Sequence, residues 1–411
     1  MARIYTTGFE AGVLEDEKER FVSTPVLPVN AAPFPTVGTE FSRSGRYCLK
    51  VSGPTSGARK YFGHMVPAPA YADELIFFRA YVMFKQFPNV ETTFMAINAN
   101  YHYLRINSSG TVKFYDKDSV ITGTTTITLN TYYCFEILTK GPGGSLKPEA
   151  RVDGVSFSST THYSAVTYNP SYYMLGLNIN LEAATSGICY FDDVAVNNQY
   201  NVQCREFVTD PYVDFPDQVT YPGPGNVLGL RIIGPGSVPY QMDEWLNYIF
   251  PGDEDNYSSV SEVPFNDNRF IATNLNEKTQ SFTFEKTGLE SGTPITCMYP
   301  SIQAAAEDGY FSYCRLGVFG MANTGFLNVD PADTSPYVLT PVDFETSHFY
   351  RVLPEKTTIT SDDVDTMSAY VVTDNISTAG GSFLRVSGFI MNVEYIGSDQ
   401  SYLNNSLMLY F

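Results

Sequence analysis

Short stretches rich in β-branched and aromatic residues, each bounded by turn residues, recur along the first 200 residues of the chain. Eight of them follow one another: Arg46–Ser52, Glu74–Phe84, Tyr101–Asn107, Thr111–Tyr115, Asn130–Thr139, Glu149–Val155, Tyr173–Asn178 and Ile188–Val196. Strand signals at this spacing are typical of two packed antiparallel sheets. The sequence therefore predicts an all-β fold that begins with a β-sandwich or jelly roll.

The residue pattern within these stretches predicts how they are buried. Residues alternate between polar and apolar in Tyr101–Asn107 and Glu149–Val155, so each of these strands should have one face in water. Glu74–Phe84 (ELIFFRAYVMF) is apolar almost throughout, which indicates a strand covered on both faces. The chain has 29 Phe and 30 Tyr against 25 Lys plus Arg, a balance that excludes a coiled coil, a helical bundle or a disordered tail.

The distribution of charge predicts two domains in the 411 residues. Residues 1–200 hold 16 basic and 17 acidic side chains, whereas residues 201–411 hold 9 and 27. We predict a jelly-roll domain over 1–202, a Pro/Gly/Asp-rich linker or docking segment over 203–228, and an acidic β-rich domain over 229–411. The net charge of −19 argues against a nucleic-acid partner, because binding to phosphates requires cationic surface.

Three further features concern membrane insertion and secretion, the cysteines and a single short helix. No apolar stretch is long enough to insert into a membrane, and MARIYTTGFE lacks the apolar core of a secretory signal. The six cysteines have no CxxC spacing, so we expect buried free thiols rather than a disulfide framework; they are Cys48, Cys134, Cys189, Cys204, Cys297 and Cys314. One short helix is expected over Ser361–Met367, with Ser361 as its N-cap.

Sequence motifs of enzymes are absent. There is no GxxxxGK[ST], HExxH or GxSxG, and the ExDxxE pattern of sandwich glycosidases is also missing. The four histidines lie in separate segments without ligand spacing, which indicates ordinary structural positions; they are His64, His102, His162 and His348. We therefore expect a protein that is not an enzyme and has no cofactor, and the sequence assigns no catalytic or metal-binding residue. Carboxylates from distant segments can also converge in a folded sheet, so a hydrolase is disfavoured rather than excluded.

Two acidic segments are the remaining candidates for a metal site. Asp192 and Asp193 are adjacent in the stretch YFDDVAV, and neighbouring side chains of a strand point to opposite faces. We expect one carboxylate to accept hydrogen bonds from loop amides and the other to face solvent, with calcium binding as the alternative. The loop Asp253–Asn256 offers several oxygen ligands without EF-hand spacing, so we interpret it as an exposed acidic turn.

Sugar binding requires aromatic surfaces combined with planar polar side chains. The tyrosines that could supply them in the first domain are Tyr101, Tyr103, Tyr132, Tyr133, Tyr172 and Tyr173. The same positions also suit sheet core or cross-strand pairs. The single tryptophan, Trp245, lies in the second half and does not support an aromatic platform in the first. Glycan binding is therefore one hypothesis among several, and its ligand-binding residues stay unknown.

The first half resembles the concanavalin A-like (laminin G-like) jelly rolls of tailed-bacteriophage structural proteins. The segments that carry the resemblance appear in order over about 190 residues: GFEAG, SRSGRYCLKV, ELIFFRAYVMF, YLRINSSGTVKFYD, NTYYCFEI, EARVDGV and LGLN followed by ICYFDDVAVNN. The second half is similar to the region that follows this jelly roll, through VLGLRIIGPG, a Trp245 segment, NYSSVSEVPFNDNRFIATN, QSFTFEKTGL and HFYRVLPEKTTITSDDVDTM.

This resemblance implies a structural component of a phage virion, associated with the tail, baseplate or fibre. Such a protein folds in the host cytoplasm and needs neither a signal peptide nor disulfides. Its partners would be other virion proteins and symmetry copies of itself, since sites on a particle are multiplied by symmetry. The alternatives are a receptor-binding lectin for a host-surface glycan, a head decoration protein and a polysaccharide depolymerase.

Overall fold

The chain forms two compact units in a computed structural model. The first unit comprises Met1–Phe9, Glu19–Asn226 and Gly397–Phe411, and the second comprises Glu10–Lys18 and Val227–Ile396. The described residues are 2–10, 12, 35–53, 60–65, 74–98, 101–117, 119–140, 145–146, 148–159, 164–165, 172–180, 182, 185–200, 225–236, 246–247, 260–261, 263, 270–273, 279–306, 312–319, 337–339, 345–348, 359–374 and 383–395. Most of the proposed linker, 203–224, lies outside them.

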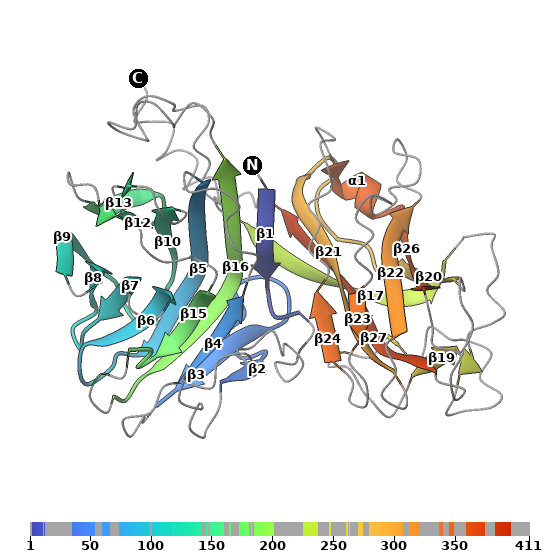
Figure 1. Cartoon of the computed structure of the whole chain (residues 1–411), viewed down its shortest axis with the longest axis horizontal. Coiled ribbons are helices and arrows are strands. Elements are labelled where there is room, and N and C mark those ends of the chain that lie inside the picture. Colours follow the sequence, from blue (N-terminus) through green and yellow to red (C-terminus); the bar gives the residue numbers. More distant parts are fainter. Residues whose placement is uncertain are drawn as a thin grey trace. The chain divides into compact units, whose positions relative to one another are not determined.

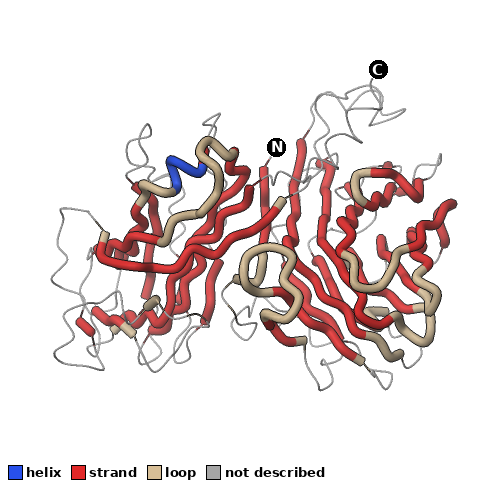
Figure 2. The backbone as a smooth tube through the Cα atoms, turned by 180° about the vertical axis from the view of Figure 1, so that it is seen from behind, coloured by secondary structure: helices blue, strands red, loops and turns tan. Residues whose placement is uncertain are grey.

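Antiparallel strands form nearly all of the regular structure in the described residues (Figures 1 and 2). This finding confirms the prediction of an all-β fold.

The first unit is built on two large sheets, here called sheet A and sheet C. Among the described residues, sheet A has the strand order β13-β12-β10-β5-β16-β3-β2, and β1 pairs with β16. Its strands are β1 (Ala2–Thr7), β2 (Thr36–Gly38), β3 (Cys48–Ser52), β5 (Glu74–Gln86), β10 (Tyr132–Lys140), β12 (Glu149–Val152), β13 (Val155–Ser159) and β16 (Ile188–Tyr200).

Sheet C has the order β4-β15-β6-β7-β8-β9 in the part of the chain that the structure describes. Its strands are β4 (Lys60–Met65), β6 (Thr92–Ile97), β7 (His102–Ile106), β8 (Thr111–Asp116), β9 (Ser119–Thr126) and β15 (Tyr172–Leu177). A short separate pair joins β11 (Ser145–Leu146) to β14 (Ser164–Ala165).

Aromatic side chains join sheets A and C into a sandwich. Phe94 of sheet C packs edge-to-face against Phe84 and Phe135 of sheet A, with ring centroids 5.5 and 5.3 Å apart. Phe78 makes the same type of contact with Tyr173 at 5.1 Å. Residues 75–84 are buried on both faces of β5, as the apolar run in the sequence predicts. Large aromatic rings bury 150–250 Å² each, so these contacts account for much of the sandwich core.

The second unit contains one large antiparallel sheet system. Among the described residues its main path is β18-β19-β27-β17-β20-β26-β22-β23, and β21 pairs with β24, β25 and β27. The strands are β17 (Asn226–Pro235), β18 (Leu246–Asn247), β19 (Ile271–Thr273), β20 (Thr279–Phe284), β21 (Pro294–Ala306), β22 (Ser312–Phe319), β23 (Tyr337–Leu339), β24 (Glu345–His348), β25 (Ile359–Thr360), β26 (Ser368–Asp374) and β27 (Leu384–Tyr395).

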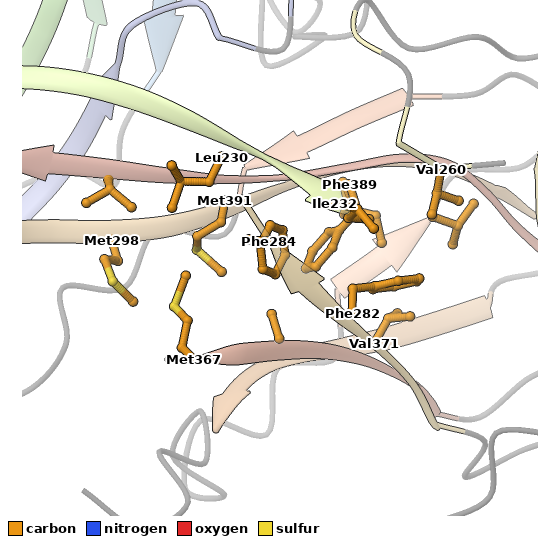
Figure 3. Packing of buried hydrophobic residues seen from close by; sticks show 14 of the residues in the cluster. Leu230, Ile232, Val260, Phe282, Phe284, Met298, Met367, Val371, Phe389 and Met391 are labelled. Atoms are coloured by element: carbon orange, nitrogen blue, oxygen red, sulfur yellow. The ribbon is translucent and has the colours of Figure 1, made fainter. Parts of the chain in front are cut away.

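A separate hydrophobic core stabilises this second unit. Phe389 lies at its centre, with the rings of Phe282 and Phe284 each 5.7 Å away (Figure 3). Aliphatic and Met side chains from β17, β21 and β27 complete the cluster, among them Ile232, Met298 and Met391. The unit therefore buries apolar side chains from strands that are far apart in sequence.

The short helix occurs where the sequence predicts it, with a different cap. It is α1 (Ser361–Val364), and its N-cap is Thr360 rather than Ser361. The Asp363 carboxylate accepts hydrogen bonds from the Thr360 backbone N–H at 3.0 Å and from the Thr360 hydroxyl at 3.1 Å. Ser361 instead donates its hydroxyl to the backbone oxygen of Glu290 at 2.7 Å. The bond to Glu290 engages the Ser361 side chain outside the helix.

Three of the cysteines can be described as side chains, and they agree with the expectation of buried thiols. Cys48, Cys134 and Cys189 are free and fully buried. Burial raises the pKa of the Cys134 and Cys189 thiols. Within the described residues, no helix has the length and apolarity needed to cross a membrane.

Candidate functional site

The outer face of sheet C carries a mixed polar and aromatic group that we call the Arg105 cluster. Its members are Glu91, Thr93, Tyr103, Arg105, Lys113, Tyr115 and Glu182. Strand pairing places most of them together, because Arg105 pairs with both Thr93 and Lys113 in neighbouring strands, and Tyr103 pairs with Tyr115. Paired residues share a face of a sheet, so three strands deliver these side chains to one surface.

Arg105 is the centre of the cluster. Its guanidinium lies over the rings of Tyr103 and Tyr115, 5.1 and 4.7 Å from their centroids. The two rings are stacked on one another with centroids 5.0 Å apart. Cation–π contact and stacking together fix the plane of the guanidinium. The cluster therefore presents a held arginine fork rather than a freely moving one.

The turn after β15 supplies a carboxylate to Arg105. Glu182 Oε1 lies 3.4 Å from Arg105 Nε and accepts hydrogen bonds from the Thr93 hydroxyl and, at 3.1 Å, the Thr93 backbone N–H. Arg105 Nε also donates to the Thr93 hydroxyl at 3.3 Å. In the same turn, the side-chain oxygen of Asn180 is buried and accepts no hydrogen bond from a described residue. The turn is thus anchored to β6 through the glutamate.

A second charged pair lies beside the first. Lys113 Nζ donates to Glu91 Oε2 at 2.7 Å, and the Tyr115 hydroxyl donates to Glu91 Oε1 at 2.6 Å. Burial acts to raise the pKa of Glu91, but the hydrogen bonds from Lys113 and Tyr115 outweigh it and lower that pKa overall. Burial and then the bond to Glu91 raise the pKa of Tyr115 to about 12. At neutral pH, Glu91 is ionised and Tyr115 is a neutral donor.

Three of the four charged side chains of the cluster reach solvent, whereas that of Glu182 is only 9% exposed. The side chains of Lys113, Glu91 and Arg105 are 32%, 28% and 25% exposed. The rings of Tyr103 and Tyr115 are buried. A ligand would therefore meet guanidinium, ammonium and carboxylate groups, and it would not stack on the tyrosines. Groups of this type can both donate to and accept from the hydroxyls of a sugar.

The other candidate tyrosines do not gather at one site. Tyr172 lies beside the Arg105 cluster, packed against the buried group that includes Tyr61 and Tyr103. Tyr173 is in the sandwich core, Tyr132 packs on the outer face of sheet A, and Tyr133 hydrogen-bonds Thr128. Tyr101 lies in the turn before β7. Of the candidates, only Tyr103 contacts Arg105, so the structure favours core and cross-strand roles for most of them.

The prediction for Asp192 and Asp193 is half right. Asp192 Oδ2 accepts hydrogen bonds from the backbone N–H groups of Arg43 at 2.7 Å and Ser44 at 3.4 Å, as expected of a loop-binding carboxylate. Asp193 does not face solvent, because it is completely buried. The pairing register shifts between Asp192 and Ala195, and Asp193 has a φ of 46°. This β-bulge turns both carboxylates towards the same turn.

Asp193 belongs to what we call the Arg43 cluster, which consists of Arg43, Ser44, Tyr81, Asp192 and Asp193. Arg43 Nη1 contacts Asp193 Oδ2 at 2.6 Å, and the Ser44 hydroxyl donates to Asp193 Oδ1 at 2.5 Å. The Arg43 guanidinium lies 3.5 Å from the centroid of the Tyr81 ring. Burial raises the pKa of Asp193 despite this contact with Arg43.

Arg43 Nη1 also donates outside the cluster, to the backbone oxygen of Gly225 at 3.1 Å and to Asn226 Oδ1 at 2.5 Å. The protein's own acceptors thus engage this nitrogen repeatedly. The Arg43 cluster is consequently a bulge-stabilising network rather than a ligand site.

The remaining candidate residues give no second site. His102 is buried, with Nδ1 2.9 Å from the Thr139 hydroxyl and Nε2 3.2 Å from Asp116 Oδ1, which confirms a structural position. Trp245 and the acidic loop Asp253–Asn256 lie outside the described residues, as does His162. In the described part of the chain, no three His, Cys, Asp or Glu side chains are grouped as metal ligands.

Comparison with known proteins gives only weak structural matches. No protein-family model and no curated protein sequence matches the chain. Among solved structures, the cellulose induced protein Cip1 is similar at a TM-score of 0.36 and 18% identity, over 47% of this chain and 96% of that one.

Two enzymes show a similar extent of overlap. A GH131 β-glucanase catalytic domain from Podospora anserina has a TM-score of 0.29 and 7% identity, over 42% of this chain and 83% of its own. An alginate lyase from Corynebacterium sp. has a TM-score of 0.30 and 12% identity over the same shares.

These matches correct one expectation from the sequence. The absence of known motifs led to the prediction that the protein is not an enzyme, yet the solved structures that match part of this chain include a glucanase and an alginate lyase. The prediction therefore does not stand. Its physical weakness is that catalytic side chains on a sheet face come from separate strands, so they need not form a motif in the sequence. None of the matches bears on a phage origin.

Proposed function

We propose that the first unit binds a polysaccharide on a cell surface through the Arg105 cluster. The observation that carries the proposal is the position of Arg105, held over two tyrosine rings beside Glu182, with the partly exposed Lys113–Glu91 pair on the same face. Donors and acceptors that strand pairing already holds in place lose little conformational freedom when they bind hydroxyl groups. Repetition on an assembly would raise a weak affinity through multivalency.

A matched pair of variants tests this proposal. Arg151 on sheet A resembles Arg105 in setting, since its side chain is 23% exposed and its Nε lies 2.8 Å from Glu149 Oε1. Arg105→Ala should reduce retention on polysaccharide gels by about tenfold or more, because hydrogen bonds to a charged group contribute about 1.5–3 kcal/mol. Arg151→Ala should leave retention unchanged. Equal loss in both variants, or in neither, would refute binding at the Arg105 cluster.

The same gels decide whether the bound polysaccharide is cleaved. Glu91 and Glu182 are the carboxylates of the cluster, and each can be replaced singly by Gln. Release of reducing ends by the native protein, lost in one of these variants while binding persists, would assign a depolymerase activity to that carboxylate. Binding without release would define a lectin.

A second proposal concerns where the protein acts. The ordered segments from GFEAG to ICYFDDVAVNN support a place in a phage virion, in the tail, baseplate or fibre, as a symmetric oligomer. Mass spectrometry of purified particles, calibrated on the major capsid protein, tests it. A small fixed copy number in multiples of three or six would support the tail location, and hundreds of copies would indicate head decoration. Absence from the particles would refute a virion role.

A further inference from the structure

The Arg105 cluster contains two cations and two carboxylates, and each cation already has a carboxylate partner. Lys113 Nζ lies 2.7 Å from Glu91 Oε2, and Arg105 Nε lies 3.4 Å from Glu182 Oε1. The formal charge of these four groups is therefore zero. Among these four groups, no charge of either sign is in excess.

This balance bears on which polysaccharide can bind, and the argument rests on the proposed function above. The carboxylate of a uronic acid or a sialic acid would have to approach Arg105 or Lys113 beside a glutamate that is already there. Like charges at such separations repel, so the glutamates oppose a second carboxylate even at the Nη groups of Arg105. An acidic sugar would thus bind against a repulsion that a neutral sugar does not meet.

A neutral sugar meets no such obstacle. Arg105 uses Nε for Thr93 and Glu182, so its terminal Nη groups are the donors a ligand would meet. The ammonium of Lys113 and the oxygens of Glu91 add a donor and acceptors a short distance along the same face. Vicinal hydroxyls both donate and accept, and they can bridge such a pair without displacing either partner.

We propose that the Arg105 cluster selects neutral polysaccharides and rejects acidic ones, with Glu91 and Glu182 as the residues that determine this specificity. The glutamates act by neutralising the two cations. Replacing either by the uncharged, nearly isosteric Gln leaves one cation in excess on the face. Such variants should therefore gain affinity for acidic polysaccharides.

Affinity electrophoresis of the full chain tests this selection. The gels contain a neutral β-glucan or galactomannan in one set and alginate or polygalacturonate in the other, at salt from about 0.05 to about 0.5 M. We expect retention on a neutral gel that changes little with salt, and retention on the acidic gels at least about tenfold weaker. Glu182→Gln and Glu91→Gln should each increase retention on the acidic gels severalfold at low salt, and high salt should remove the gain.

Matched variants separate failure of the selection from failure of the proposed function. Glu149→Gln removes the carboxylate that pairs with Arg151 on sheet A and should give no gain on acidic gels. Preference of the native protein for an acidic gel, abolished by Arg105→Ala, would overturn the selection and keep the binding site. No retention on any gel, or retention that Arg105→Ala leaves intact, would overturn the site itself and the selection with it.

Discussion

The Arg43 and Arg105 clusters use the same groups on the two sheets of the first unit and differ in what remains for a ligand. Each places a guanidinium over a tyrosine ring and beside a carboxylate. Arg43 Nη1 is bonded to Asp193, Gly225 and Asn226, and Asp193 is completely buried. Arg105 bonds through Nε, and the adjacent Lys113–Glu91 pair is partly exposed to solvent. At Arg43 a terminal nitrogen is bonded to protein acceptors, whereas at Arg105 the bonds go through Nε, and this difference distinguishes a structural arginine from one whose terminal nitrogens are available for recognition.

The largest expected effect is on stability, at the Arg43 cluster. Asp193→Ala removes the buried partner of Arg43 and leaves its charge uncompensated, which costs about 3–5 kcal/mol in comparable buried pairs. Urea unfolding followed by tyrosine fluorescence measures the loss. Lys113→Ala, which breaks the partly exposed pair with Glu91, should cost less than about 1 kcal/mol. Similar costs for the two variants would remove the distinction between the clusters.

The next effect is on binding, and it tests whether a positive charge at position 105 is sufficient to bind polysaccharide. Arg105→Lys keeps the positive charge but loses the planar fork that lies over Tyr103 and Tyr115. We expect retention on the polysaccharide gel to fall about tenfold, with a change in unfolding free energy below about 1 kcal/mol. Full retention in this variant would show that the fork is not the recognising group.

A smaller effect is expected in alkali, through Tyr115. Its pKa of about 12 in the folded chain exceeds the ordinary value of about 10, so the unfolded state loses this proton first. The stabilisation from the neutral phenol is complete below about pH 10 and is lost as the pH rises towards 12. Tyr115→Phe should therefore lose less stability than the native protein between pH 10 and pH 12. Parallel urea midpoints across that window would show that Tyr115 is not perturbed.

The smallest effect concerns the cysteines of sheet A and leaves the fold unaltered. Cys48, Cys134 and Cys189 are fully buried, and burial keeps the last two protonated. At most three of the six thiols should react with a water-soluble disulfide reagent in the native protein, and all six should react in urea. Reaction of four or more under native conditions would contradict this packing.

Local patterns were sufficient to predict the strands and insufficient to predict the site. The apolar run from Glu74 to Phe84 identifies a strand covered on both faces, because hydrophobicity at successive positions is a property of the segment itself. The alternation in YHYLRIN places Tyr103 and Arg105 on one face, and TVKFYD does the same for Lys113 and Tyr115. These two signals were present in the sequence.

Their assembly into one cluster depends on long-range register. Glu182 meets Arg105 only because the turn after β15 is anchored to β6, across 89 residues of sequence from Thr93. The Asp192–Asp193 error has a similar cause, since a β-bulge reverses the facing of a side chain and has no clear signature without a glycine. Pairing geometry, rather than composition, decided both outcomes.

The most direct test compares alanine variants of the two arginines. Arg43→Ala and Arg105→Ala are each measured for their urea midpoint and for their retention on the polysaccharide gel that the native protein prefers. We predict crossed results, with Arg43→Ala clearly destabilised but still retained at a temperature where it is folded, and Arg105→Ala nearly as stable as the native protein but no longer retained. Loss of stability without loss of binding in Arg105→Ala would contradict the assignment of the Arg105 cluster as the binding site.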